Sequence, residues 1–171
     1  METTDKVTKF GNYAHSIIAE AEEKYSDAKS NLEPLDYIAH WTGTFLLMME
    51  EMIENTDTVA DLLRCIAVNG MVGHEIVSKS PTGFNALANQ MTDLYARKSR
   101  DYGNSFDKSM DKWGLPVAAI RIGDKENRLQ SLIAKRGEAE VKDESLADTF
   151  IDLSCYATMT LMWMDEKRVE S

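Results

Sequence analysis

The chain has 171 residues, of which 43% are hydrophobic and 28% are charged, and its formal net charge is -10 at pH 7. This length is enough for one domain with a hydrophobic core, or for a domain with a helical extension. Because so acidic a chain would repel phosphates, we expect no nucleic acid polymer as a partner. The acidic balance suits a divalent-cation site, although acidic residues also simply keep a protein soluble.

Cysteine usage and hydropathy indicate the compartment. Cys65 and Cys155 lie in apolar helical contexts without CxxC spacing, which is typical of free thiols in a reducing cytoplasm. The N-terminus has no basic, apolar signal, and no apolar run reaches the roughly 18 residues of a membrane span. We therefore expect a cytoplasmic protein with no membrane partner.

The spacing of apolar residues predicts an all-α protein, a helical bundle of about six helices. The predicted helices span, in chain order, residues 5–29, 35–54, 56 onward, 81–113, 116–135 and about 141–164. Tyr102-Gly103-Asn104 can interrupt the fourth helix, and the tail after Met164 is expected to fray. A soft boundary near Lys79 separates an N-terminal helical portion (1–79) from a C-terminal domain (80–171), unless the two form one continuous domain.

The last predicted helix carries an acidic stripe. Glu144, Asp148 and Asp152 follow one another at four-residue spacing and therefore share one side of the helix. The helix is amphipathic, and its buried side is expected to consist of Leu146, Phe150, Leu153 and Ala157. The acidic line itself continues into Cys155 and other apolar residues, so the carboxylates lie partly inside the fold. Buried carboxylates need a cation, a metal or a proton, and we take a divalent-cation site as the leading interpretation.

The preceding helix carries a mixed arc of charges: Arg121, Asp124, Lys125 and Arg128. Beside the acidic stripe, its carboxylate would add a metal ligand, and its cations would contact the phosphates of a substrate. The alternative is an internal salt-bridge network, in which Asp124 and Asp148 pair with Arg121 and Arg128.

A third segment has residues suited to a nucleobase. Lys98 is followed by Tyr102, Gly103 and Asn104. The glycine permits a bend or a close backbone approach, the tyrosine offers a stacking face, and the asparagine offers a donor and an acceptor. The alternative is an ordinary helix kink with a buried tyrosine.

The three segments, K-x-x-DYGNSF, RIGDKxxRL and KDES-x-x-DT-x-x-DL-x-x-Y-x-x-M, together resemble the nucleotide modification associated domain 1 family of phages and bacteria. The resemblance covers about residues 95–164. That family is similar to the all-α MazG-like nucleotide pyrophosphohydrolases, so the resemblance implies a MazG-like core in the C-terminal half. It also implies hydrolysis, dependent on Mg²⁺ or Mn²⁺, of a (deoxy)nucleoside triphosphate or modified nucleotide to monophosphate and pyrophosphate.

By position, the resemblance also implies roles for single residues. The implied metal ligands are Asp124, Glu144, Asp148 and Asp152. The implied catalytic residues are Asp124, Asp148 and Asp152. The implied substrate-binding residues are Lys98, Tyr102, Asn104, Lys125 and Arg128.

The chain also departs from the MazG-like pattern. Asp124-Lys125-x-x-Arg128 stands where an EExxE run is usual, and Cys155 stands where asparagine is usual. These departures favour a second hypothesis, a non-catalytic phage helical protein that binds a nucleotide or a host protein. A third is a structural bundle whose charged faces form only salt bridges. A homodimer or tetramer is expected, because a short bundle often needs a partner to complete its core.

Overall fold

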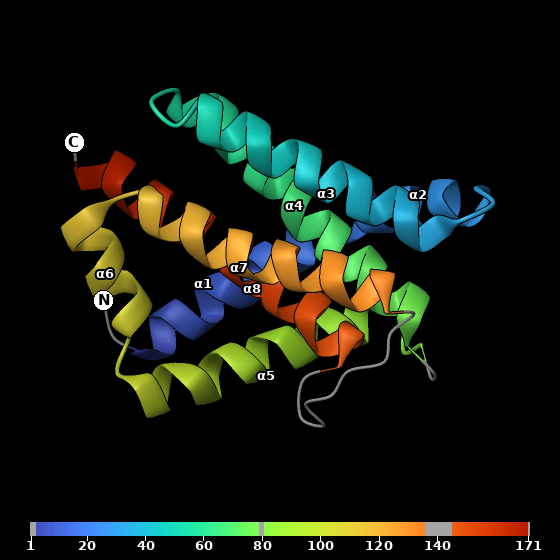
Figure 1. The fold of residues 1–171 in the computed structure, drawn as a ribbon. Coiled ribbons are helices and arrows are strands. Elements are labelled where there is room, and N and C mark those ends of the chain that lie inside the picture. The colour runs from blue at the N-terminus through green and yellow to red at the C-terminus, as the bar shows by residue number, and fades with distance from the viewer. Residues whose placement is uncertain (1–2, 79–80, 136–144, 171) are drawn as a thin grey trace.

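The computed structural model describes residues 3–78, 81–135 and 145–170, and the regular secondary structure within them is entirely helical (Figure 1). The helices are α1 (Thr3–Ser16), α2 (Ile18–Lys29), α3 (Pro34–Glu51), α4 (Thr56–Val77), α5 (Phe84–Tyr102), α6 (Ser105–Trp113), α7 (Pro116–Ala134) and α8 (Leu146–Glu170). The all-α prediction is confirmed. The expected number of about six helices was too low, since the described residues form eight.

Two of the predicted helices are each divided. Ile17 leaves the helical conformation, with φ -101° and ψ 2°, and separates α1 from α2. Neither glycine nor proline marks this position, so the apolar pattern predicted one helix across it. The second division lies at Gly103 and Asn104, where an interruption was expected, and both residues have positive φ.

The last helix extends beyond the predicted end at Met164. The basic side chains of its final turns have partners on other helices: Lys167 pairs with Asp111 of α6 at 3.1 Å, and Arg168 pairs with Asp57 of α4 at 2.6 Å. Cations in the last turn also suit the negative end of the helix dipole. The expectation that this tail frays was therefore wrong up to Glu170.

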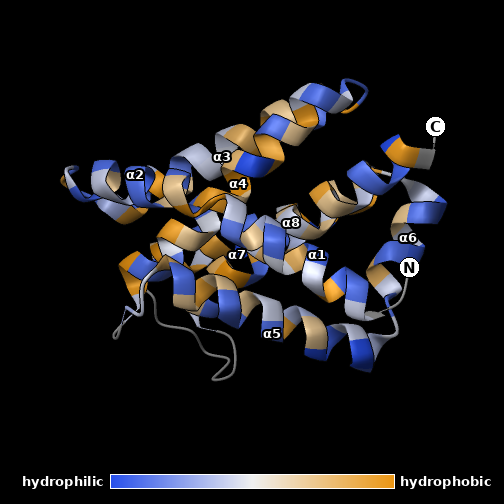
Figure 2. Ribbon diagram, turned by 180° about the vertical axis from the view of Figure 1, so that it is seen from behind, coloured by the Kyte–Doolittle hydropathy of each residue, from blue (hydrophilic) through white to orange (hydrophobic). Residues whose placement is uncertain are grey.

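Helix α8 lies in the interior of the bundle, and α1, α4, α5 and α7 pack against it (Figure 1). Its inner residues Phe150, Leu153 and Ala157 are fully buried, as the amphipathic pattern predicted. Hydrophilic and hydrophobic residues alternate along the surrounding helices, which places their apolar sides toward α8 (Figure 2). Within the described ranges, each helix is either too short or too polar to span a lipid bilayer.

Two glycines of α4 set its close approach to α8. A Cβ at Gly70 would lie 2.8 Å from the Phe150 carbonyl oxygen and 2.8 Å from the Ser154 amide nitrogen, and one at Gly73 would overlap the Phe150 ring. Ser154 Oγ also donates a hydrogen bond to the carbonyl of Ala67 at 2.8 Å. Helix α4, which precedes the predicted boundary near Lys79, is thus packed directly on α8, which follows it.

We predict that Gly70→Ala destabilises the protein by about 1–3 kcal/mol, the usual effect of overpacking a core, because the backbone that the new methyl would meet cannot rotate away. Urea unfolding followed by circular dichroism measures the change.

Gly123→Ala on α7 is the matched control, since its Cβ would lie 3.9 Å from the nearest atom, Leu46 Cδ2. It should stabilise by about 0.5–1 kcal/mol, the helical advantage of alanine over glycine. Equal stabilities of the Gly70 variant and the parent protein would contradict the proposed close packing.

Candidate functional site

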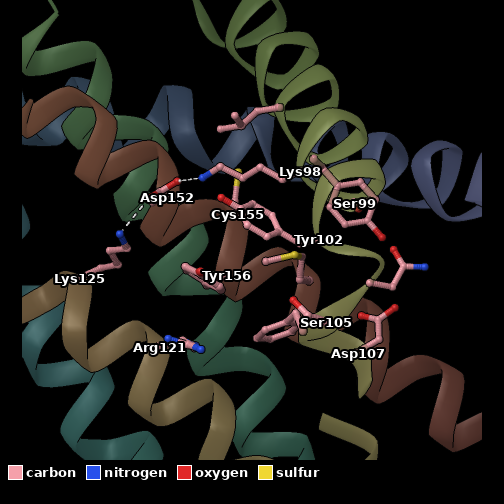
Figure 3. A pocket seen from close by; sticks show the side chains of 15 residues that line it. Lys98, Ser99, Tyr102, Ser105, Asp107, Arg121, Lys125, Asp152, Cys155 and Tyr156 are labelled. Atoms are coloured by element: carbon pink, nitrogen blue, oxygen red, sulfur yellow. Dashed lines mark hydrogen bonds and ion pairs between the residues drawn. The ribbon is translucent and has the colours of Figure 1, made fainter. Parts of the chain in front are cut away.

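A pocket with a volume of about 370 Å³ opens among α5, α6, α7 and α8 (Figure 3). The side chains that line it come from all four helices: Leu94, Tyr95, Lys98, Ser99, Tyr102, Asn104, Ser105, Phe106, Asp107, Arg121, Lys125, Asp152, Cys155, Tyr156 and Met159. All three segments singled out in the sequence contribute to this list.

The turn between α5 and α6 shapes one wall of the pocket. Gly103 ends α5 with φ 57°, and Asn104 follows with φ 55°. Glycine adopts this left-handed conformation without steric cost, and asparagine tolerates it better than most residues. A Cβ at Gly103 would meet no atom within 4 Å, so glycine is required there by backbone conformation and not by space. Tyr102, Asn104 and Ser105, which lie at or beside this turn, all line the pocket.

An ionic cluster of three helices lies at one end of the pocket. Asp152 of α8 accepts a hydrogen bond from Lys98 Nζ of α5 at 2.8 Å, and its other carboxylate oxygen lies 3.0 Å from Lys125 Nζ of α7 (Figure 3). The Asp152 side chain is only 20% exposed. A half-buried carboxylate is tolerated here because cations flank it on two sides.

The cluster shifts the pKa values of its members in opposite directions. Burial alone would raise the pKa of Asp152, but the hydrogen bonds and charges of Lys98 and Lys125 outweigh burial and hold it below the ordinary 3.8. Burial alone would lower the pKa of Lys98, but its hydrogen bond to Asp152 and the charge of that carboxylate raise it above 10.5. Both shifts favour the ionised pair at neutral pH.

The ionic end of the pocket carries more positive than negative charge. Lys98 and Lys125 share the carboxylate of Asp152 there, and Arg121 lines the pocket one helical turn before Lys125; among the described residues, no other carboxylate lines this end. Arg121 is exposed at the pocket wall and forms no ion pair with any residue that the structure describes. In a chain of net charge -10, this is a local basic site.

The opposite end of the pocket is organised by Asp107 of α6. Its carboxylate pairs with Lys6 of α1, which reaches across from the N-terminal helix. Tyr95 lies beside it, with its ring stacked on Phe10 at a centroid distance of 4.4 Å. Asp107 and Ser99 lie across the pocket from Asp152 and Lys125 (Figure 3). The two ends of the pocket therefore differ in charge and in hydrogen-bonding character.

Five of the predicted site residues line this pocket. They are Lys98, Tyr102, Asn104, Lys125 and Asp152. Tyr102 is 69% exposed, so the alternative of a kink with a buried tyrosine is wrong. Asp124, Asp148 and Arg128 do not line the pocket, and Glu144 lies outside the described residues.

The residues outside the pocket have other surroundings. Asp124 is exposed on α7. The Asp148 carboxylate accepts hydrogen bonds from the Ser145 amide at 3.0 Å and from its hydroxyl at 2.6 Å, while Ser145 Oγ accepts from the Asp148 amide at 3.1 Å. This is a capping box at the start of α8. Arg128 Nε donates to Thr149 Oγ1 at 3.3 Å.

Three of the four implied metal ligands, Asp124, Asp148 and Asp152, fall within the described residues. Across residues 3–78, 81–135 and 145–170, no three histidine, cysteine, aspartate or glutamate side chains lie close enough together to hold an ion. Of the implied metal ligands that the structure describes, Asp152 lines the pocket and Asp124 and Asp148 do not, and the Asp152 carboxylate is paired with two lysines.

Other pocket residues were not among the predicted site residues. Arg121 belongs to the predicted arc whose cations were expected to contact phosphates, but it was not among the implied substrate-binding residues. Tyr156 follows Asp152 by four residues, so helical spacing alone could have placed it on the same side. The pairing of Asp107 with Lys6 spans 101 positions, and no local pattern could reveal it. Cys155 also lines the pocket, and burial raises its pKa to about 12, so its thiol is neutral.

We predict that Asp152→Asn destabilises the protein by about 1–3 kcal/mol at neutral pH, because it removes hydrogen bonds between charged groups. A depressed pKa contributes stability that is fully present above the unfolded-state value, near 3.8, and is lost as the pH falls through the lower folded-state value. The difference in unfolding free energy between the parent and this variant should therefore shrink below about pH 4.

Urea unfolding at a series of pH values measures this difference. Asp124→Asn, which removes an exposed carboxylate from the neighbouring helix, should change stability by no more than about 0.5 kcal/mol. A difference for Asp152→Asn that stays constant down to pH 3 would contradict the shifted pKa.

Comparison with known proteins gives one match. Residues 98–164 match the family described as nucleotide modification associated domain 1. No curated protein and no solved structure matches the chain. The matched range contains every pocket residue from Lys98 to Met159, which leaves only Leu94 and Tyr95 outside it. The name of this family indicates a role associated with nucleotide modification, and the pocket lies in the part of the chain that resembles it.

Proposed function

We propose that the pocket binds a nucleotide, with a phosphate group at the ionic end and the base among the aromatic side chains. The observation that carries this proposal is the cluster itself: two lysines from different helices converge on one carboxylate at the wall of a pocket. The family match over the same residues supports a nucleotide as the ligand.

The lysines have hydrogen-bonding capacity left for a phosphate. Each ammonium group has three donors, and Asp152 takes one bond from each lysine. Phosphate oxygens would accept the remaining donors in charge-assisted hydrogen bonds, which are roughly twice as strong as neutral ones. Arg121 lies one turn before Lys125 on α7 and lines the same pocket. Its planar guanidinium group has N–H donors that can contact two phosphate oxygens at once.

The wall beyond the cluster suits a base. Tyr156 packs against Phe106 with ring centroids 5.6 Å apart, and Tyr102 offers an exposed ring at the edge of the pocket. Stacking of a base on an aromatic ring contributes about 1–3 kcal/mol and depends little on which base is bound, because every base has a π-face. Asn104, at the same edge, supplies an amide that both donates and accepts.

We predict that Lys98→Gln and Lys125→Gln each weaken nucleotide binding by about tenfold or more, since each removes a charged donor to the phosphate. Isothermal titration calorimetry with a panel of nucleotides measures the affinity, and the rise in melting temperature on adding the same ligands checks it.

Arg97→Gln is the matched control, because Arg97 precedes Lys98 on α5 but does not line the pocket. It should leave the affinity unchanged. An equal loss in the Arg97 variant, or no loss in the two lysine variants, would contradict the assignment of the phosphate to this cluster.

A second candidate function is hydrolysis of a (deoxy)nucleoside triphosphate or modified nucleotide to monophosphate and pyrophosphate. The resemblance to MazG-like enzymes favours it, as does the position of Asp152 beside the proposed phosphate site. Mg²⁺ commonly uses one or two protein carboxylates together with substrate phosphates. On this proposal Asp152 would be the carboxylate of the described pocket lining that is placed to hold Mg²⁺ or Mn²⁺ beside the phosphates, since Asp124 and Asp148 lie outside the pocket.

Asp152→Asn distinguishes the two candidates. If the protein only binds nucleotides, loss of the carboxylate leaves both lysines to the phosphate, and affinity should rise by roughly fivefold, the size of an exposed charge interaction. If the protein is a hydrolase, release of pyrophosphate in the presence of Mg²⁺ or Mn²⁺ should fall to background in this variant.

The parent protein is assayed beside the variant with the same nucleotides, and circular dichroism confirms that both are folded. No change in either affinity or pyrophosphate release would show that this pocket is not the nucleotide site.

A further inference from the structure

One end of the pocket carries an excess of cations and the other end carries the carboxylate of Asp107. This difference limits the class of nucleotide that the pocket can hold. We infer, on the basis of the proposed function, that the ligand is a nucleoside monophosphate, with its single phosphate at the ionic end and hydroxyl or amino groups directed to Asp107.

Charge matching is the first argument. The described pocket lining carries three cations, Lys98, Lys125 and Arg121, and Asp152 compensates one of these charges, while Asp107, the other carboxylate of the lining, is paired with Lys6. Two positive charges are therefore uncompensated. A phosphate monoester carries about -1.5 to -2 at pH 7, which neutralises this excess. Each further phosphate would bring negative charge for which the described part of the pocket lining has no additional cation.

The surroundings of the ionic end support the same conclusion. Asp124 adjoins Lys125 on α7 and is exposed, and Asp148 lies one turn before Asp152 on α8 and is exposed as well. Arg128, the next cation along α7, donates to Thr149 and does not line the pocket. A second or third phosphate extending from the cluster along these helices would therefore approach carboxylates.

The opposite end determines the direction of the ligand. The Asp107 carboxylate has no donor to offer a phosphate, but its oxygens accept hydrogen bonds from hydroxyl or amino groups. Lys6 pairs with Asp107 and holds it in place. Asp107 and Ser99 lie across the pocket from Lys125 and Asp152 (Figure 3). A molecule with one anionic end and one end rich in hydrogen-bond donors matches this arrangement.

The volume of the pocket is consistent with a small ligand. Small-molecule pockets generally occupy roughly 300–1,000 Å³, and about 370 Å³ lies near the lower end of this range. A nucleoside monophosphate is the smallest nucleotide, so a volume near the lower end of the range favours it over the larger di- and triphosphates.

The test is a calorimetric titration of the full chain with a nucleoside and its mono-, di- and triphosphates, all with the same base, at low salt and with a chelator to remove metal ions. We expect the monophosphate to bind about tenfold or more tightly than the nucleoside, and the di- and triphosphates to bind no more tightly than the monophosphate.

The possible failures are distinguishable. A triphosphate that binds about tenfold more tightly than the monophosphate would overturn this inference and leave the proposed nucleotide site intact. Binding by none of these compounds, repeated with each of the common bases, would overturn the proposed function and the inference together.

Arg121→Gln provides a second readout that does not depend on folding, since Arg121 is exposed. Monophosphate affinity should fall by about three- to fivefold, while affinity for the unphosphorylated nucleoside stays the same. Arg97→Gln is again the control and should change neither affinity. An equal loss of nucleoside and monophosphate affinity in the Arg121 variant would contradict its role in phosphate binding.

Discussion

The half-buried carboxylate of Asp152 is the constraint on which the arrangement of the site depends. A carboxylate in that position is unfavourable unless cations compensate it, and the cations come from two other helices, α5 and α7. Its two oxygens thus connect three helices at one point. The pocket lies beside this connection, and the lysines that compensate Asp152 are also the groups available to a phosphate.

The rest of the bundle keeps α8 and the pocket wall in place. On one side, the glycines of α4 allow α8 to approach closely enough for Phe150 and Ser154 to contact the α4 backbone and side chains. On another, α1 supplies Lys6, which pairs with Asp107 of α6. The N-terminal helices, for which the motifs indicated no role, therefore support the side of the pocket that faces away from the ionic cluster.

The sequence predicted features that depend on local spacing and missed those that depend on distant contacts. Helical periodicity was enough for the all-α fold, for the buried side of α8, and for the requirement that the acidic stripe find cations. The motifs placed Lys98, Lys125 and Asp152 in one site, and the structure brings them together. The alternative salt-bridge network joined Asp124 and Asp148 to Arg121 and Arg128, whereas the ion pairs at the pocket join Asp152 to Lys98 and Lys125. Ser145-x-x-Asp148 is itself a capping pattern, so the separate role of Asp148 was readable from the sequence. Neither glycine nor proline marks the break at Ile17, and Lys6 and Asp107 are 101 positions apart, so neighbouring residues carry no signal for either feature.

A crystal structure of the protein with a bound nucleotide tests the central claim most directly. The account predicts phosphate oxygens within about 3.2 Å of the Nζ atoms of both Lys98 and Lys125, with the base against the aromatic wall. A nucleotide bound elsewhere on the protein, with both lysines still directed only at Asp152 and the pocket occupied by solvent, would contradict it.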